Sequence, residues 1–227
     1  MISLGLPSVM FFIAAAGWAL FASYKATRSG RWLTLVMFWL VIQGALSLAG
    51  FYQYATTPPK IMLITFPPLV FVITRLLTLK GRDFLANLDL FWILAYHLVR
   101  IPVEIGLFLL AAEGKVPLGM TFEAGNYDII SGMSALIIIF LQLSGRLTAK
   151  VLFTWNTICL LLLLYIMITA NLSVPGPMQH LNFDRPNIGF RYFPAVWLPS
   201  FIAPMALLCH LAIFIKLYRH RQLSVNS

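Results

Sequence analysis

The chain has 227 residues, of which 60% are hydrophobic and only 10% are charged, and its mean hydropathy is +0.88. Soluble domains carry about 25% charged residues, so this composition excludes most classes of soluble enzyme. The formal net charge of +9 does not indicate a nucleic-acid partner, because the basic residues stand singly or in small groups at the ends of apolar stretches. We therefore predict an integral membrane protein that forms a single domain over residues 1–227, with the lipid bilayer as its main partner.

Seven apolar stretches fill almost the whole chain. A helix that crosses about 30 Å of hydrocarbon needs about 20 apolar residues. Helices are required because lipid satisfies no backbone hydrogen bonds. The first stretch has no basic segment before it and no small-residue cleavage site after it, so we expect it to be retained as a helix. The predicted fold is an all-α bundle of seven transmembrane helices over residues 4–24, 32–52, 61–79, 86–111, 127–145, 150–171 and 193–217.

Positive charge alternates between successive loops. Ten basic residues follow the odd-numbered stretches, namely Lys25, Arg28, Arg31, Lys80, Arg82, Arg146, Lys150, Lys216, Arg219 and Arg221. Four lie on the opposite side, namely Lys60, Lys115, Arg185 and Arg191. Short cytoplasmic loops carry an excess of Lys and Arg. The bias predicts an outside N-terminus and a cytoplasmic C-terminus for a multi-pass protein of the bacterial inner membrane.

The fourth stretch carries three ionisable residues at membrane depth, His97, Arg100 and Glu104. At about 100° per residue, Arg100 lies about 60° and Glu104 about 20° from His97 around a helix, so the three share one face. Arg100 and Glu104 are also i,i+4 neighbours that could neutralise each other. Pro102 frees the carbonyl of Leu98 and offers a kink. We predict a ligand-binding or catalytic site here, with a structural ion pair as the alternative.

The start of the fifth stretch is also polar, with Asn126 and Asp128. By the predicted topology it lies on the outer side, near Glu104. Ser131 and Gly132 follow, and such small residues let helices approach closely. Asp128 could face Arg100 or a ligand and is, with Glu104, a candidate catalytic acid or base. The alternative is a helix cap formed by Asn126 or Asp128.

The longest loop, residues 172–192, contains His180, Asp184 and Arg185. Its prolines stiffen it, and its apolar residues favour packing against the bundle. We predict that it roofs an outward-facing cavity and brings Asp184 or Arg185 within about 10 Å of Glu104 or Asp128, an arrangement typical of a ligand pocket. An ordered surface loop without chemistry is the alternative. No spacing of metal ligands is present, so no metal is predicted, and the sequence names no cofactor.

The remaining polar residues have simpler interpretations. Lys216 is expected to anchor the last stretch at the cytoplasmic edge, and Arg75 to snorkel toward the same edge, with Asp89 as a possible partner. His210 is interpreted as a hydrogen-bonded core residue. Two cysteines, Cys159 and Cys209, lie within apolar runs and are expected to be small core residues rather than a disulfide or metal site.

Two resemblances add to this reading. The run HLVRIPVE, together with MTFEAGNYDIISG, NFDRPN and YFPAVWLPSFIAP, resembles a family of uncharacterised bacterial integral membrane proteins, which implies a seven-helix membrane fold but no function. The segment from Arg100 to Glu104 is similar to the PxEE-type motif of integral-membrane lycopene cyclases, in which acidic residues are thought to serve proton-initiated cyclisation. Ile105 stands in place of the second glutamate, and the motif occurs once.

Three functions remain open. The first is binding or transport of a small polar or amphipathic ligand in the outward-facing cavity. The second is a membrane enzyme in which Glu104 or Asp128 acts as acid or base on a lipidic or isoprenoid substrate. The third is a structural subunit whose polar face meets a partner membrane protein.

Overall fold

The computed structural model describes residues 4–53, 60–177 and 179–225, and this part of the chain is all-α, without a strand. The α-helices are α1 (Leu6–Thr27), α2 (Gly30–Leu48), α3 (Met62–Leu77), α4 (Leu79–Asn87), α5 (Leu90–Tyr96), α6 (Arg100–Ala112), α7 (Ile129–Leu143), α8 (Ala149–Leu172) and α9 (Ala203–Val225). Short 3₁₀ segments are η1 (His97–Val99), η2 (Leu118–Met120) and η3 (Gly189–Arg191), and a π-helical turn, η4 (Leu198–Ile202), leads into α9.

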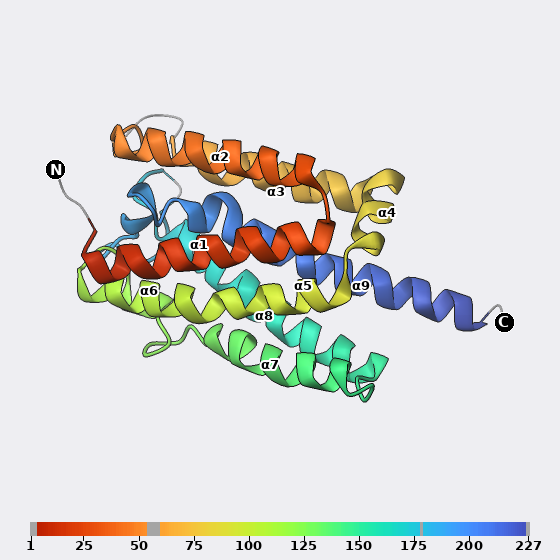
Figure 1. Ribbon diagram of the computed structural model, residues 1–227. Coiled ribbons are helices and arrows are strands. Elements are labelled where there is room, and N and C mark those ends of the chain that lie inside the picture. Colours follow the sequence, from red (N-terminus) through yellow and green to blue (C-terminus); the bar gives the residue numbers. More distant parts are fainter. Residues whose placement is uncertain (1–3, 54–59, 178, 226–227) are drawn as a thin grey trace.

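The helices lie along one common axis (Figure 1). Helices α1, α2 and α3 run alternately along it, α5 and α6 together form the next pass, and α7, α8 and α9 continue the alternation. Helix α4 turns away at one end, and the N- and C-termini lie at opposite ends. Helix α1 packs along α5 and α6, and α8 packs on α9.

Five helices are long and apolar enough to cross a membrane, or six if α3 and α4 count as one bent span, among the residues the structure describes. These helices are compatible with a membrane protein. They are α1, α2, the continuous α5–α6 segment, α8 and the segment from Leu198 to Arg219. Helix α7, the fifth expected span, is apolar but has only 15 residues. Neither the predicted number of seven spans nor their orientation follows from the helix lengths alone.

Some predicted boundaries need correction. The third stretch ends at Leu77, and a second helix follows at an angle of 95° where a loop was expected. The side chain of Thr78 starts that helix, because its hydroxyl accepts a hydrogen bond from the N–H of Gly81 at 3.1 Å. The fourth stretch begins at Leu90 rather than at residue 86, after Asp89 caps the helix by accepting from the N–H of Trp92.

Prolines shape the two helical passes that line the site. Pro102 follows the 3₁₀ segment η1, so the expected local irregularity lies in the pass formed by α5 and α6. In the last pass, Pro204 has no N–H to offer the carbonyl of Ser200 in α-helical register. That carbonyl instead accepts a hydrogen bond from the indole N–H of Trp39 at 3.0 Å. A helix from another part of the chain thus satisfies the backbone group that the proline leaves open.

Small residues bring the central helices close together. Gly106 of α6 lies against the ring of Phe12 in α1, and a Cβ atom at Gly106 would be 3.0 Å from that ring. Gly132 of α7 faces α6, where a Cβ atom would be 2.9 Å from Cγ1 of Ile101. The close approach expected from the small residues of the fifth stretch is therefore confirmed at Gly132.

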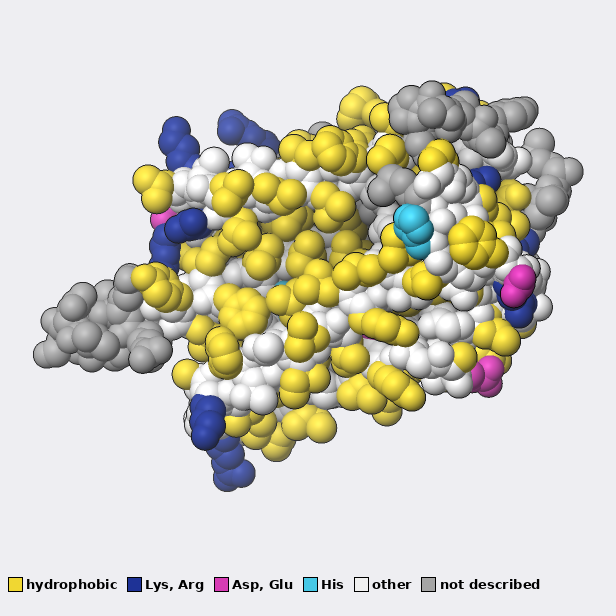
Figure 2. All heavy atoms as spheres, turned by 180° about the vertical axis from the view of Figure 1, so that it is seen from behind, with side chains coloured by type: hydrophobic (Ala, Val, Ile, Leu, Met, Phe, Trp, Pro, Cys, Tyr) yellow, Lys and Arg dark blue, Asp and Glu magenta, His cyan; other side chains and the backbone are white. Residues whose placement is uncertain are grey.

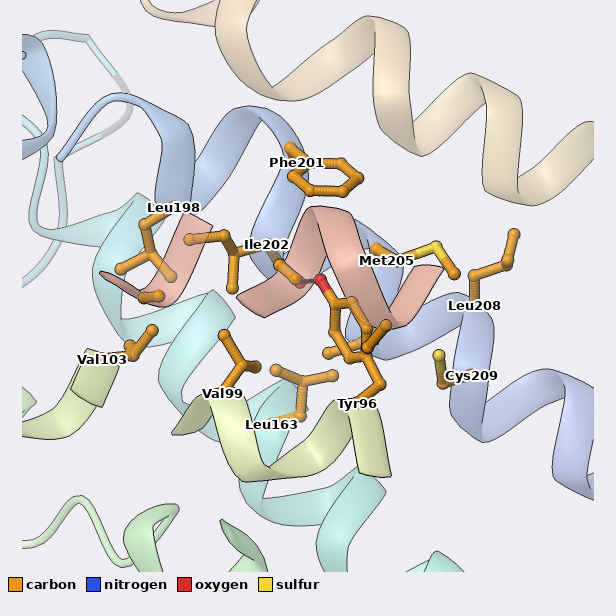
Figure 3. Close-up of a cluster of buried hydrophobic side chains, with 14 of the residues drawn as sticks. Tyr96, Val99, Val103, Leu163, Leu198, Phe201, Ile202, Met205, Leu208 and Cys209 are labelled. Carbon is orange, nitrogen blue, oxygen red and sulfur yellow. Dashed lines mark hydrogen bonds between the residues drawn. The ribbon is translucent and has the colours of Figure 1, made fainter. Parts of the chain in front are cut away.

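The apolar core and the apolar surface are both extensive. Figure 3 shows buried side chains of α5 and α6 meeting those of η4 and α9, with the Tyr96 hydroxyl donating to the carbonyl of Ile202 at 3.0 Å. Many large hydrophobic side chains are exposed. On the face that Figure 2 shows, hydrophobic side chains cover much of the surface between the two ends of the bundle, and Lys and Arg side chains lie mainly at those ends. Such a surface suits a lipid environment.

A polar clamp fixes the start of α1 to the end of α6. The carboxylate of Glu113 accepts hydrogen bonds from the Ser8 hydroxyl, from the N–H of Gly5 at 3.0 Å and from Nζ of Lys115 at 2.7 Å. Partial burial raises the pKa of Glu113, but these hydrogen bonds outweigh burial and hold the pKa below its usual range.

Candidate functional site

A buried ion pair lies at the centre of the bundle. The guanidinium of Arg100, on the first turn of α6, pairs with the carboxylate of Asp128 at the start of α7, and the two side chains are only 3% and 6% exposed. The Asp128 carboxylate also accepts a hydrogen bond from the Ser131 hydroxyl at 3.2 Å. Asp128 stands at the N-cap position of α7, yet its side chain makes no capping hydrogen bond. Its role as an ion-pair partner therefore replaces a cap by Asp128, whereas the side chain of Asn126 accepts a hydrogen bond from the N–H of Asp128 at 3.1 Å.

The same guanidinium reaches α9. Its Nη2 lies 2.8 Å from Nε2 of His210, whose Nδ1 lies 2.7 Å from Oδ1 of Asn156 in α8. A guanidinium can only donate hydrogen bonds, so Nε2 of His210 accepts and the proton of this neutral imidazole is on Nδ1. The Asn156 amide is consistent with this tautomer, because its Nδ2 donates to the His210 carbonyl at 3.1 Å while its Oδ1 accepts from Nδ1.

Glu104 lies one turn beyond Arg100 on α6 and is 1% exposed. Its Oε2 accepts a hydrogen bond from Nδ2 of Asn126 at 2.7 Å. Asn126 is itself oriented by the carbonyl of Met120, to which it donates at 3.1 Å, and by the N–H of Asp128, from which it accepts at 3.1 Å. The other carboxyl oxygen of Glu104, Oε1, is buried and has no hydrogen-bond partner among the described residues.

His97 lies on the opposite side of this network. Its ring is fully buried and lies 4.3 Å from the ring of His210, centroid to centroid, with the planes 31° apart. The indole of Trp155 meets the same ring edge-on at 5.5 Å. Neither ring nitrogen of His97 has a hydrogen-bond partner in the described part of the chain. The ring therefore packs against the network without being hydrogen-bonded into it.

A cleft opens beside Arg100, Glu104 and Asp128. Its volume is about 70 Å³, and apolar side chains form most of its wall. Val99 at the end of η1 and Val103 and Leu107 on α6 follow one another at intervals of four residues, and they line the cleft together with Arg100 and Glu104. The facing wall comes from α3, α8, η3 and the η4–α9 segment, with Thr65, Leu69, Leu163, Ile166, Met167, Ala170, Asn171, Phe190, Leu198, Pro199, Ile202, Ala203, Pro204 and Ala206. Several of these apolar side chains are visible in Figure 3.

The long loop packs against the bundle but does not carry its polar residues to the cleft. Arg185 donates to the carbonyl of Ala111 at the end of α6. The N–H groups of Ile188 and Gly189 donate to the carbonyl of Lys115 at 3.0 and 2.8 Å. His180 and Asp184 are exposed on the loop surface, and neither lines the cleft.

The predicted site is thus brought together only in part. His97, Arg100, Glu104, Asn126 and Asp128 form one buried cluster. The expected ion pair of Arg100 with Glu104 is wrong, because the guanidinium turns toward α7 and α9 and binds Asp128 and His210 instead.

Two members of the cluster were not predicted as site residues. His210 was expected to be a core residue, and Asn156 was not considered. Both are fully buried polar residues in apolar stretches. A polar residue within a long apolar stretch of the sequence is the signal that could have identified each of them. Among the described residues, no group of three or more His, Cys, Asp or Glu side chains could hold a metal ion.

Residues 57–218 match the family described as a domain of unknown function, DUF8737. The match covers more than half of the chain, so the chain belongs to this family. No curated protein and no solved structure matches the chain. The expected membership of a family without a known function is confirmed, whereas none of these comparisons supports the local likeness to lycopene cyclases.

Proposed function

We propose that this member of the DUF8737 family is a seven-span membrane protein that binds an amphipathic ligand in the cleft beside Glu104. The apolar part of the ligand lies along α6, α8 and the start of α9. Its polar group donates a hydrogen bond to Oε1 of Glu104. A primary or secondary amine is the chemistry that suits this position best, because it provides both a donor and a positive charge.

The observation that carries this proposal is the state of Glu104. Its side chain is 1% exposed, lines the cleft and has one oxygen without a partner in the described residues. Arg100 and Asp128 pair with each other, so the carboxyl of Glu104 has no counter-ion of its own among the residues that the structure describes. A buried polar group without a partner is costly, and one in hydrocarbon costs several kcal/mol. A ligand that donates to Oε1 removes this cost.

The proposed topology rests on loop charge and on the direction of the helices. With α3 and α4 as one bent span and α7 as a short one, successive passes alternate and complete seven crossings. The basic excess in the loops after α1, α3 and α7 favours a cytoplasmic position for that end. The cleft then opens toward the outer half of the bilayer, in the bacterial inner membrane.

The experiment is a thermal-shift titration of the purified full chain in a nonionic detergent with three twelve-carbon probes: dodecylamine, dodecanol and dodecanoic acid. We expect the amine to stabilise the protein most. At one hundred times its Kd, a ligand stabilises by about 2.7 kcal/mol, which corresponds to roughly 5–10 °C for a chain of this length.

The matched control compares two glutamates. Glu104→Gln should lose most of the stabilisation by dodecylamine, whereas Glu123→Gln, at an exposed position in the loop before α7, should keep it. The proposal fails if dodecylamine stabilises no more than dodecanol, or if the Glu104→Gln protein responds like the unchanged chain.

A membrane enzyme is the second candidate, and the same carboxyl oxygen favours it. A buried acid beside an apolar cleft could transfer a proton to a lipidic or isoprenoid substrate. Mass spectrometry of lipids from membranes that express the chain would then reveal a product that is absent with Glu104→Gln. Identical lipid profiles in the two strains would exclude this reaction for those membranes.

A further inference from the structure

A second, larger groove lies between α2, α3 and the η4–α9 segment. Its volume is about 390 Å³, within the range of ligand pockets. Aromatic, aliphatic and proline side chains form nearly all of its wall: Trp32, Leu35, Val36, Phe38, Trp39, Ile42, Pro67, Pro68, Phe71, Val72, Phe201, Pro204, Met205 and Leu208, with Ser200 as the one hydroxyl. It is distinct from the cleft at Glu104, with which it shares only Pro204.

Two lining residues have buried polar atoms without a partner in the described part of the chain. They are the indole N–H of Trp32 and the hydroxyl of Ser200, and Ser200 is only 1% exposed. Four other indoles have partners, since Trp18, Trp39, Trp155 and Trp197 donate to Ala95, Ser200, Ser134 and Leu40, respectively. An indole N–H can only donate, so the unpaired donor of Trp32 calls for an acceptor on the occupant of the groove.

A positive charge lies beside the same end of the groove. The guanidinium of Arg75 is 4.8 Å from the ring centre of Phe71, a lining residue whose ring is 5.6 Å from that of Trp32. Arg75 also stacks on Phe84, at 4.9 Å. The expected partner Asp89 instead binds Arg28 at 2.7 Å. No ion pair of Arg75 with a carboxylate is present in the described residues.

These observations specify the ligand by its charge. Arg75 and the Trp32 indole both donate hydrogen bonds and cannot accept them, so this end suits an anion. The rest of the groove is apolar. The hydroxyl of Ser200 provides one further donor. Trp39, which donates to the carbonyl of Ser200, lies seven residues after Trp32 on α2. Ser200 is therefore about 10 Å farther along the groove than Trp32. A single ligand that combines these features has an anionic head and a hydrocarbon tail.

We infer that the groove is a binding site for an anionic phospholipid. Its phosphate lies at Arg75 and Trp32, and one acyl chain runs along Pro67, Pro68 and Phe201. The groove end at Arg75 precedes the bend into α4 and its basic residues Lys80 and Arg82, where a lipid headgroup would meet the membrane surface.

The test measures lipid binding to the purified full chain in a nonionic detergent, by native mass spectrometry with dioleoyl phosphatidylglycerol and dioleoyl phosphatidylcholine. We expect about tenfold tighter binding of the anionic lipid. Because a hydrogen bond to a charged group accounts for an effect of this size, Arg75→Gln should reduce the preference to nearly none. Trp32→Phe keeps the ring but removes the N–H, and should weaken binding several-fold.

The control is Arg146→Gln, which removes the same charge from an exposed loop at the same end of the bundle. Arg146→Gln should leave the preference for the anionic lipid unchanged. Glu104→Gln should also leave it unchanged, so the lipid site and the proposed amine site are tested separately. Equal losses with Arg75→Gln and Arg146→Gln would overturn the site, as would equal binding of the two lipids. Binding of inorganic phosphate alone with the same affinity as the anionic lipid would also overturn it, because the acyl chain would then contribute nothing. A thermal melt of each variant without added lipid identifies loss of folding, and Trp32→Phe provides an independent reading if Arg75→Gln fails to fold.

Discussion

Breaking the Arg100–Asp128 pair should destabilise the protein strongly. Both side chains are almost fully buried, at 3% and 6% exposure, so removing one partner leaves the other charge without compensation. The cost of breaking a buried pair in this way is about 3–5 kcal/mol. For a chain of about this length, 1 kcal/mol shifts the melting temperature by roughly 2–4 °C. Arg100→Gln and Asp128→Asn should therefore each lower it by at least about 6 °C.

A double-mutant cycle separates this pair from the one that the sequence suggested. Arg100→Gln combined with Asp128→Asn should recover part of the loss, with a coupling of up to about 3 kcal/mol, as contacting residues show. Arg100→Gln combined with Glu104→Gln is the matched control, and its coupling should be clearly smaller, since Glu104 binds Asn126 rather than Arg100.

The assay is a thermal melt of each variant in the same nonionic detergent, followed by the fluorescence of the native tryptophans. Strictly additive losses for the 100–128 pair would refute the reasoning. Larger coupling between residues 100 and 104 than between residues 100 and 128 would show that the guanidinium of Arg100 pairs with Glu104 instead of Asp128.

Three further outcomes follow from the fold. Gly132→Ala should destabilise by about 1–3 kcal/mol because its Cβ would meet Ile101 at 2.9 Å, whereas Gly17→Ala, with nothing within 4 Å, should be neutral or stabilising in the same thermal melt. The pKa of Glu113 is lowered in the fold, so its contribution to the free energy of unfolding is complete above the unfolded pKa of about 4.3 and is lost as the pH falls through the lower folded pKa. Glu113→Gln should therefore flatten the acid side of a curve of stability against pH. Cysteines introduced at the exposed positions Ser144 and His180 should differ in intact cells, with only the second labelled by an impermeant thiol reagent, and the reverse pattern would invert the proposed topology.

The helical passes were largely predictable, because long apolar runs leave the backbone no alternative to a helix. Their ends were less so. The helix α4 is short and polar, and its start depends on one side chain, Thr78, that caps it. The 3₁₀ segment before Pro102 was foreseeable from the proline. The contact of Trp39 with the carbonyl of Ser200 in the π-helical turn was not, because it joins two helices that are far apart in the sequence.

The candidate site shows a similar division. Helical periodicity placed His97, Arg100 and Glu104 on one face, and that face is indeed buried. Periodicity within one helix cannot, however, decide which neighbouring helix lies against that face. The partners Asp128 and His210 come from α7 and α9, and those contacts turned the guanidinium away from Glu104. For the same reason, the exposed positions of His180 and Asp184 could not be read from the loop sequence.

The position of Arg100 in the polar cluster determines whether protons can move along the cluster. The carboxyl groups of Glu104 and Asp128 lie on one side of the guanidinium, with Asn126, and His210 lies on the other, with Asn156. Among the described residues, the hydrogen bonds that join the two sides pass through Arg100. A guanidinium does not give up its proton in proteins. It therefore interrupts any proton relay along the cluster. In the proposed topology, the cluster should therefore not conduct protons across the bilayer.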